Sequence, residues 1–366
     1  MSIEHRVSQL VEEVAEVDTV IAAAARRRHQ GLLKPPGSLG ALEELSVTLA
    51  AIAGINPPPP PSQPAVIIAA GDHGVHAQGV TPWPQSITAT MVEMFCAGKA
   101  AVNAIAAAVG AQISVLDVGV ANPVADHPLL RKARVRSGTA DLTQGPAMTT
   151  DEAAQALLAG AGLAEELVGA GVDLFVPGDM GIANTTASAC LIAAFTGREA
   201  AEVTGRGAGI DDATLRRKIE VVRAAVERHF TSERGIAAAG DPLSALAAVG
   251  GLEHAALVGV ILSAAADGLP VVLDGVTAGA AALVAVALCP AASGYLVAGH
   301  RSAEPGASAA LEHLKLDPVI DLGLRLGEGT GGLLAVPIVQ ASARALGEMG
   351  ALADVVAGVG VEPDGA

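Results

Sequence analysis

The run Ala65-Val-Ile-Ile-Ala-Ala70, which leads directly into Gly71-Asp-His-Gly74, decides the fold of this 366-residue chain. A short, continuous apolar run that ends at a glycine-rich polar turn is typical of a buried strand that enters a loop. The same pattern recurs at residues 112–118, 173–177, 270–274 and 294–298. We therefore expect five buried strands, each followed by a loop that contains glycine.

Helical patterns lie between and outside these strands, at residues 5–30, 39–52, 211–230, 246–266 and 331–356. Strands that alternate with helices indicate an α/β fold, with a parallel sheet covered by helices on both faces. Ligands of such sheets bind at the carboxyl ends of the strands, where we expect the polar loops to converge. Residues 1–30 and 331–366 are expected to form a small helical domain, and residues 31–330 the large α/β domain.

The composition excludes several classes of partner. The formal net charge is −16 and no basic run is present, which argues against nucleic acid as a partner. Cys96, Cys190 and Cys289 are far apart and odd in number, so they indicate neither a metal site nor a disulfide framework. The first residues have no apolar signal core, and a cytoplasmic protein is the expectation.

An uncharged segment from Gly275 to Gly299 is long enough to cross a bilayer. Gly279 and Gly294 interrupt it, and Pro290 should end a helix there. A buried helix followed by a buried strand fits these residues better than a membrane span, so no membrane partner is expected.

The most reactive-looking stretch is the glycine-dense turn of residues 322–332, which contains Glu328. A carboxylate in a turn that precedes a helix suggests acid–base chemistry, and free N–H groups at the start of the helix could bind an anion. The spacing Gly327-x-Gly329-x-x-Gly332 formally matches a dinucleotide fingerprint. Only helix is expected after it, so no second strand completes the required unit. Glu328 could also simply favour the helix dipole.

Two further loops could hold a phosphorylated ligand. Residues 178–186 follow a strand and open a helix, so their amides, Asn184 and the Thr185 and Thr186 hydroxyls could hold a phosphate or a sugar hydroxyl. Asp179 could pair with a ribose hydroxyl or steady a cation. The alternative is a helix start capped by threonine.

Residues 205–212 have the same glycine-rich character. Arg206 could meet phosphate or lie on the surface, and Lys218, on the following helix, could also reach an anion. Asp211 or Asp212 is the expected helix cap.

Asp72 and His73 resemble a fragment of a metal site or catalytic triad, but no third partner has a recognisable spacing. His73 is expected to be structural or to face a sugar. The lone Trp83 could stack on an aromatic ligand or belong to the core. Residues 271–279 are similar to the diphosphate-sugar loop of common phosphoribosyltransferases but lack its paired acids and second hydroxyl residue. A magnesium–diphosphate substrate is therefore disfavoured.

In combination and in this order, the loops resemble the nicotinate-nucleotide–dimethylbenzimidazole phosphoribosyltransferase family, which makes the lower ligand of cobalamin. The matching segments are residues 34–40, 71–75, 178–186, 205–212, 271–275, 300–302, 304–306 and 322–332. The resemblance implies a Rossmann-like large domain, a small domain built from both termini, and a homodimer. It also implies transfer of the phosphoribosyl group of nicotinate mononucleotide to 5,6-dimethylbenzimidazole, giving α-ribazole 5′-phosphate and nicotinate.

The family's general base falls on Glu328, and its expected task is to take the benzimidazole N–H proton as the other ring nitrogen attacks C1′ with inversion. Nicotinate leaves from a pyridinium, so no metal or other cofactor is expected. Asp179 remains an uncertain second catalytic residue. The residues expected to bind substrate are Gly178, Gly181, Asn184, Thr185, Thr186, Gly205, Arg206, Gly207, Lys218, Gly327, Gly329, Asp72, His73, Trp83 and Met91.

Two departures from the family pattern concern the loop of residues 178–186, where Asp179 replaces a glutamate and Ala183 a glycine. The shorter Asp179 reaches less far, and Ala183 is expected to narrow the approach to the backbone. The base pocket near residues 83–86 and Met91 varies within the family, so the preferred base stays open. Two rival hypotheses are an N-ribosyl hydrolase, with water as acceptor, and a non-catalytic binder of a nucleotide or benzimidazole.

Overall fold

The computed structural model describes residues 3–230 and 241–359 and contains a six-stranded sheet in which every pairing is parallel. The strands are β1 (Pro64–Gly71), β2 (Gln112–Gly119), β3 (Leu130–Lys132), β4 (Leu174–Met180), β5 (Val271–Leu273) and β6 (Leu296–Ala298). Their order, β3-β2-β1-β4-β5-β6, is that of a Rossmann fold and confirms the expected class. The sequence pattern missed β3, which has three residues and no fully buried side chain.

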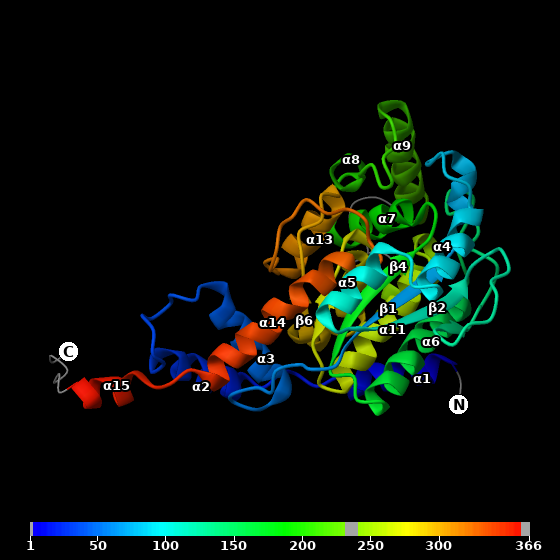
Figure 1. Ribbon diagram of the computed structural model, residues 1–366. Coiled ribbons are helices and arrows are strands. Elements are labelled where there is room, and N and C mark those ends of the chain that lie inside the picture. The colour runs from blue at the N-terminus through cyan, green and yellow to red at the C-terminus, as the bar shows by residue number, and fades with distance from the viewer. Residues whose placement is uncertain (1–2, 231–240, 360–366) are drawn as a thin grey trace.

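Alternate residues of each strand face two different cores. Ala65, Ile67 and Ala69 of β1 belong to one core, and Val66, Ile68 and Ala70 to the other. The first core is closed mainly by α6 (Thr150–Gly169), α7 (Asn184–Thr196), α11 (Leu252–Ala266) and α12 (Val276–Leu288). The second is closed by α4 (Ser86–Cys96), α5 (Ala101–Val109) and α14 (Thr330–Glu348). The sheet thus lies between two helical layers, as Figure 1 shows.

Three predicted helices are each two helices, and a local cause is visible at each break. Residues 5–30 form α1 (Ile3–Glu13) and α2 (Thr19–Gln30), because the Asp18 carboxylate caps α2 by accepting bonds from the Val20 and Ile21 N–H groups. Residues 331–356 lie in α14 and α15 (Leu352–Val359), separated where Ala351 pairs with Leu32.

The third break divides residues 246–266 into α10 (Pro242–Val249) and α11 at Gly250–Gly251. A Cβ at Gly251 would lie 2.4 Å from atoms of both His73 and Glu253, so the backbone there must approach a buried cluster closely. The remaining helices are α3 (Ala41–Ala53), α8 (Ala200–Val203), α9 (Asp212–His229) and α13 (Pro305–Leu314), with 3₁₀ turns η1 (Gly74–Gln78) and η3 (Pro290–Tyr295).

Segments from both ends of the chain meet in a separate small core. Ala25, Val47, Ala50 and Leu346 bring together α2, α3 and the end of α14. The backbone N–H of Leu33 donates to Gly350 O at 2.8 Å, and that of Leu352 donates to Gly31 O at 2.9 Å. Helix α1 instead contributes to the core beneath the sheet, so these contacts support a small unit of α2, α3 and the end of α14. The domain boundaries themselves stay a prediction, and residues 1–2 and 360–366 lie outside the described chain.

The uncharged segment of residues 275–299 forms α12, η3 and β6, and most of it is buried, as predicted. A different stretch, Ser86–Val109, is long and apolar enough to cross a membrane by length and composition. It consists of α4 and α5 with a turn at residues 97–100, and each helix alone is shorter than the roughly 17 residues that a span needs.

The strand order reverses direction between β1 and β4. In an open parallel sheet the loops on either side of such a point diverge and leave a crevice at the carboxyl ends of the strands. The loops that leave β1, β4, β5 and β6 at this edge are the ones that carry the polar sequence motifs.

Candidate active site

A pocket opens at the carboxyl edge of the sheet, between the loop that follows β4 and the turn that precedes α14. Ten of the predicted site residues line it: Asp179, Gly181, Asn184, Thr185, Thr186, Arg206, Gly207, Lys218, Gly327 and Glu328. Loops far apart in the sequence therefore converge on one cavity.

Glu328 stands in a turn of unusual backbone conformation. Its φ is +63°, and the glycines on either side, Gly327 and Gly329, have φ of +83° and +88°. A left-handed glutamate is disfavoured, so the surrounding structure must impose this conformation. The side chain lines the pocket although the residue is only 6% exposed, and its Oε2 has no hydrogen-bond partner within the described chain.

The surroundings of Glu328 suit a base. Burial raises the pKa of its carboxyl to about 7, the nearby Asp274 charge acts in the same direction, and the Val102 backbone N–H acts in the opposite one. A general base is most effective when its pKa lies near the working pH. A buried carboxylate with such a pKa and one oxygen without a partner in the described chain can accept a proton from a ligand in the pocket.

The anion site expected at the start of α14 is already filled by the protein itself. Asp274 Oδ1 accepts bonds from the Gly331 and Gly332 N–H groups at 2.7 and 3.1 Å, and Oδ2 accepts one from the Gly329 N–H at 3.0 Å. The expectation that these donors bind a substrate anion is therefore wrong. This pairing could not be predicted from sequence, because Asp274 lies 55 residues before Gly329.

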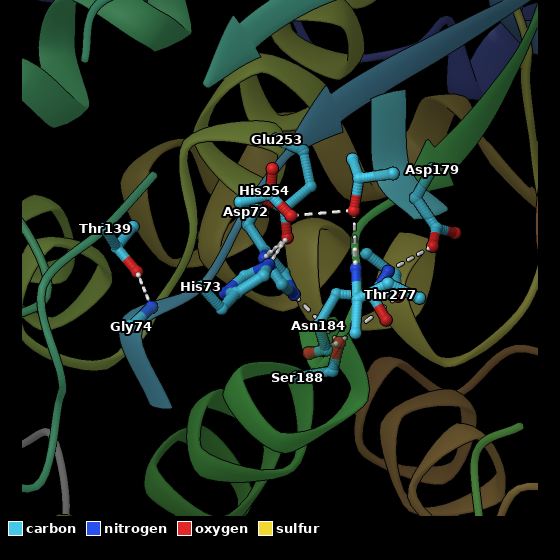
Figure 2. Close-up of polar contacts among 12 residues, drawn as sticks. Asp72, His73, Gly74, Thr139, Asp179, Asn184, Ser188, Glu253, His254 and Thr277 are labelled. Carbon is cyan, nitrogen blue, oxygen red and sulfur yellow. Dashed lines mark hydrogen bonds and ion pairs between the residues drawn. The ribbon is translucent and has the colours of Figure 1, made fainter. Parts of the chain in front are cut away.

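Asp179 lies near the end of β4 and also lines the pocket, where a Cβ at Gly327 would come within 3.4 Å of its Oδ1. Its Oδ2 accepts a bond from the Asn184 side-chain amide at 2.6 Å (Figure 2). Burial raises the pKa of Asp179 to about 7, helped by the charges of Asp274 and Glu253 and opposed by bonds from Asn184 and Thr277. The pocket thus holds a second carboxyl whose pKa is raised toward neutral pH.

A buried lysine, Lys218, provides one of the positive charges of the pocket. Lys218 Nζ donates to Thr185 Oγ1 at 2.7 Å and to Gly205 O at 3.1 Å. An ammonium has three donors, so one N–H is left for a ligand. Burial lowers the pKa of Lys218 to about 8, although the Glu304 carboxylate opposes this shift.

Glu304 and Arg325 also line the pocket, and neither was among the predicted site residues. Both hold the loop at Gly207: Glu304 Oε1 accepts a bond from its N–H, and Arg325 Nη1 donates to its carbonyl, each at 2.8 Å. Glu304 does lie in the Glu-Pro-Gly motif of the family resemblance, which was the available signal. Arg206 forms an ion pair with Asp212 and donates to Ile210 O, so its guanidinium also stabilises this loop.

Beneath the pocket lies a buried cluster of His73, Glu253 and His254 (Figure 2). Glu253 Oε1 is 2.8 Å from His73 Nε2 and 2.7 Å from His254 Nδ1. His254 Nε2 in turn contacts Ser188 Oγ at 2.8 Å. The partner that sequence spacing did not reveal for His73 is thus Glu253, which lies 180 residues further along the chain.

The three side chains of this cluster are of metal-binding types. Two atoms bound to one tetrahedral zinc at about 2.0–2.1 Å would lie about 3.3 Å apart. The contacts at 2.7 and 2.8 Å are shorter, as direct polar contacts between the side chains are. Burial would lower the pKa of His73, but the Glu253 carboxylate outweighs it and raises that pKa. The two histidines together hold the pKa of Glu253 well below its usual range.

The other predicted binding residues lie outside the pocket lining. Asp72 accepts bonds from Thr88 Oγ1 at 2.7 Å and from the Ala121 N–H at 2.8 Å. Trp83 is 46% exposed, and Met91 packs against the second core. Gly178 and Gly205 make space: a Cβ would lie 2.6 Å from Glu328 O at the first and 2.0 Å from Glu304 Oε2 at the second.

The parallel sheet and the site at its carboxyl edge define an α/β enzyme, and a family model described as phosphoribosyltransferase matches residues 14–358. A protein of Salinispora tropica named nicotinate-nucleotide–dimethylbenzimidazole phosphoribosyltransferase is 53% identical over 350 residues, covering 92% of this chain and 94% of its own. The protein of that name from Chloroflexus aggregans is 50% identical, with 95% and 96% covered.

A crystal structure of the Thermus thermophilus protein of the same name superimposes with a TM-score of 0.87 at 44% identity, covering 94% of this chain and 99% of that one. The chain therefore belongs to the nicotinate-nucleotide–dimethylbenzimidazole phosphoribosyltransferase family, as its loops predicted.

Proposed function

We propose that this enzyme transfers the phosphoribosyl group of nicotinate mononucleotide to 5,6-dimethylbenzimidazole, and that Glu328 is the general base. One ring nitrogen of dimethylbenzimidazole attacks C1′ of the nucleotide. The bond from C1′ to the pyridinium nitrogen breaks, and its electron pair leaves with nicotinate. The proton on the other ring nitrogen passes to Glu328, so the products are α-ribazole 5′-phosphate, nicotinate and a protonated carboxyl. Attack opposite the leaving group inverts C1′.

The observation that carries this proposal is the state of Glu328: buried, at the wall of the pocket, with its Oε2 lacking a hydrogen-bond partner in the described chain, and with a pKa of about 7. The attacking benzimidazole becomes acidic at its N–H only as the new bond forms, so a base of this strength matches the task. The names of the relatives supply the two substrates.

The phosphate is proposed to lie against Lys218, Thr185 and Thr186. Lys218 is the buried cation of the described pocket residues, and the two threonines stand at the start of α7, where backbone N–H groups favour an anion. Asp179 and Asn184, which are bonded to each other, are candidates for the ribose hydroxyls. Trp83 and Met91 remain candidates for the base pocket, and the preferred base is open.

The test is to incubate the purified protein with nicotinate mononucleotide and dimethylbenzimidazole, with and without a chelator, and to follow both products. Equal amounts of α-ribazole 5′-phosphate and nicotinate, unaffected by chelator, are expected. Ribose 5-phosphate and nicotinate formed without the base would indicate the hydrolase. Binding of both substrates without turnover would indicate a non-catalytic binder.

We also propose a cytoplasmic homodimer that binds small molecules, without nucleic acid or membrane. What supports the dimer is the family resemblance together with a set of partly exposed apolar side chains over α4 and α5: Ile87, Met91, Met94, Ile105 and Val109. Apolar surface of this kind often marks a protein interface. Light scattering should give twice the monomer mass, and a single 36.1 kDa species at micromolar concentration would contradict the dimer.

A further inference from the structure

Asp274 follows β5 and is buried behind the turn that carries Glu328. Its two carboxylate oxygens accept the three backbone bonds from Gly329, Gly331 and Gly332 described above, and His300 Nε2 lies 3.4 Å from Oδ1. One side chain thus satisfies three of the donors that a helix leaves free in its first turn. The first of these donors belongs to the residue directly after Glu328.

The Glu328 turn needs such support. Three successive residues, 327–329, have positive φ, and the central one is not glycine. A conformation of this kind persists only when neighbouring groups fix it from several sides. On the other side of the turn, the Glu328 carbonyl lies against Gly178, where a Cβ would come within 2.6 Å. Asp274 and Gly178 therefore enclose the backbone of Glu328 from β5 and β4.

Asp274 also affects Glu328 through its charge. Its negative charge adds to burial in raising the pKa of the Glu328 carboxyl. Within the described chain, the Asp274 carboxylate bonds to N–H groups of the turn and of the start of α14 and lies near His300, which is also buried. Its charge also raises the pKa of Asp179, but its backbone hydrogen bonds all lie on the Glu328 turn and the start of α14.

We propose that Asp274 is a positioning residue, which locks the start of α14 so that the Glu328 carboxylate meets the N–H of the attacking base. The inference rests on the proposed role of Glu328. A general base displaced by about 1 Å can lose about 100-fold in rate while substrate binding is kept. Asp274 therefore acts on the rate of the chemical step and not on the affinity for nicotinate mononucleotide.

The experiment compares wild type with D274A, D274N and a matched control, D18A, in which another capping aspartate is lost at α2. D274A should lower kcat about 10–100-fold and change the KM for nicotinate mononucleotide less than about 3-fold. Because a like charge is removed, the acid limb of its kcat profile should move to lower pH. D18A should keep the wild-type kcat and profile.

Formate supplies the decisive readout. D274A leaves three backbone donors and a space shaped for a carboxylate at the start of a helix, where small anions bind. Added sodium formate should restore kcat at least several-fold and return the acid limb toward that of wild type, whereas sodium chloride at equal ionic strength should not. A purely structural role would give neither the shift nor the rescue.

Two results would overturn the proposal: a D274A kcat within 2-fold of wild type, or a loss of kcat that formate and pH leave unchanged. If D274A does not fold, D274N is the test of the proposal. Its side chain keeps the volume of aspartate, but its amide NH₂ group faces at least one backbone N–H donor, so that hydrogen bond is lost. D274N with wild-type kcat and an unshifted acid limb would then refute the proposal. Failure of the proposed function would look different, since wild type itself would make no α-ribazole 5′-phosphate.

Discussion

Two helices, α7 and α14, begin at the carboxyl edge of the sheet, and their starts look alike in sequence. Each follows a glycine-rich loop with one acidic residue, and each is preceded by a left-handed residue, Ala183 with φ +78° or Gly329 with φ +88°. Yet the first residues of α7 line the pocket beside Lys218, whereas those of α14 are bonded to Asp274. The difference teaches that a distant carboxylate decides which helix start is left free for a ligand.

The largest change in activity is expected on substitution of Glu328, the acidic residue at the start of α14, where Asp274 already binds the free N–H groups. E328Q should lower kcat about 10²–10⁴-fold, because the amide cannot accept the proton, while the KM of both substrates changes little. Product formation at saturating substrate measures this. The control is E348Q at the exposed end of the same helix, which should behave as wild type. Near wild-type turnover of E328Q would remove Glu328 from the mechanism.

At the free helix start, Lys218 is the next residue to test. K218M should raise the KM for nicotinate mononucleotide about 10–100-fold, since a bond from a charged donor contributes about 1.5–3 kcal/mol. The wild-type pKa of about 8 adds a pH effect: the ammonium loses its charge as pH rises through 8, so nucleotide affinity should fall there.

Titration calorimetry from pH 6 to 9 would measure both effects of Lys218, with R217M as the neighbouring control. Arg217 is exposed and contacts only Gly79 O among the described residues. An unchanged KM in K218M, or the same pH dependence in K218M and wild type, would contradict a phosphate site at α7.

The E328Q substitution, which lowers activity, should raise the stability of the protein above neutral pH. The pKa of Glu328 is raised from 4.5 to about 7, so its favourable contribution is present below pH 4.5 and is lost as pH rises through 7. E328Q should therefore be more stable than wild type at pH 8, by on the order of 1 kcal/mol, and similar near pH 4.5. Urea unfolding at both pH values measures it. Equal stability at pH 8 would mean that ionised Glu328 is not disfavoured in the fold.

The smallest effect is expected from Ala183, where the family pattern has glycine. An alanine in the left-handed conformation destabilises the folded state by about 1–2 kcal/mol, which glycine would relieve. Glycine in turn lowers the stability by about 0.4–1 kcal/mol, because it makes the unfolded chain more flexible. A183G should therefore stabilise the protein by at most about 1.6 kcal/mol, with a slightly lower KM for the nucleotide. Thermal unfolding measures the stability, and a clear loss would show that the Ala183 methyl group packs usefully.

Most of the sheet could be predicted because its strands are buried on both faces and therefore read as continuous apolar runs. The strand β3, Leu-Arg-Lys, has no such run because it lies at the edge and is largely exposed. The breaks between helices are harder to predict from the sequence. Asp18 and Gly250–Gly251 interrupt apolar periodicity that continues on both sides, so the spacing alone indicated one long helix.

The residues of the candidate site also differ in how well the sequence predicts them. Loop residues of one motif, such as Asn184 and Thr185, could be placed together because the sheet edge gathers them. The pairing of Asp274 with the start of α14, and of Glu253 with His73, depends on elements far apart in sequence. Neither carboxylate stands in a recognisable spacing with its partner, so only the folded chain reveals the two pairings.

Helix α14 joins two places that chemistry alone would not connect. It begins at the Glu328 turn, against the sheet, and ends in the small core with α2 and α3, about 28 Å away at 1.5 Å per residue. Helix α14 is continuous over its 19 residues, although Pro337 lies inside it, so it connects the small core directly to the turn of the proposed base. A tilt of the helices in the small core would therefore change the distance between the Glu328 carboxylate and the benzimidazole N–H. The packing of the two ends of the chain is in this way coupled to the proposed proton transfer.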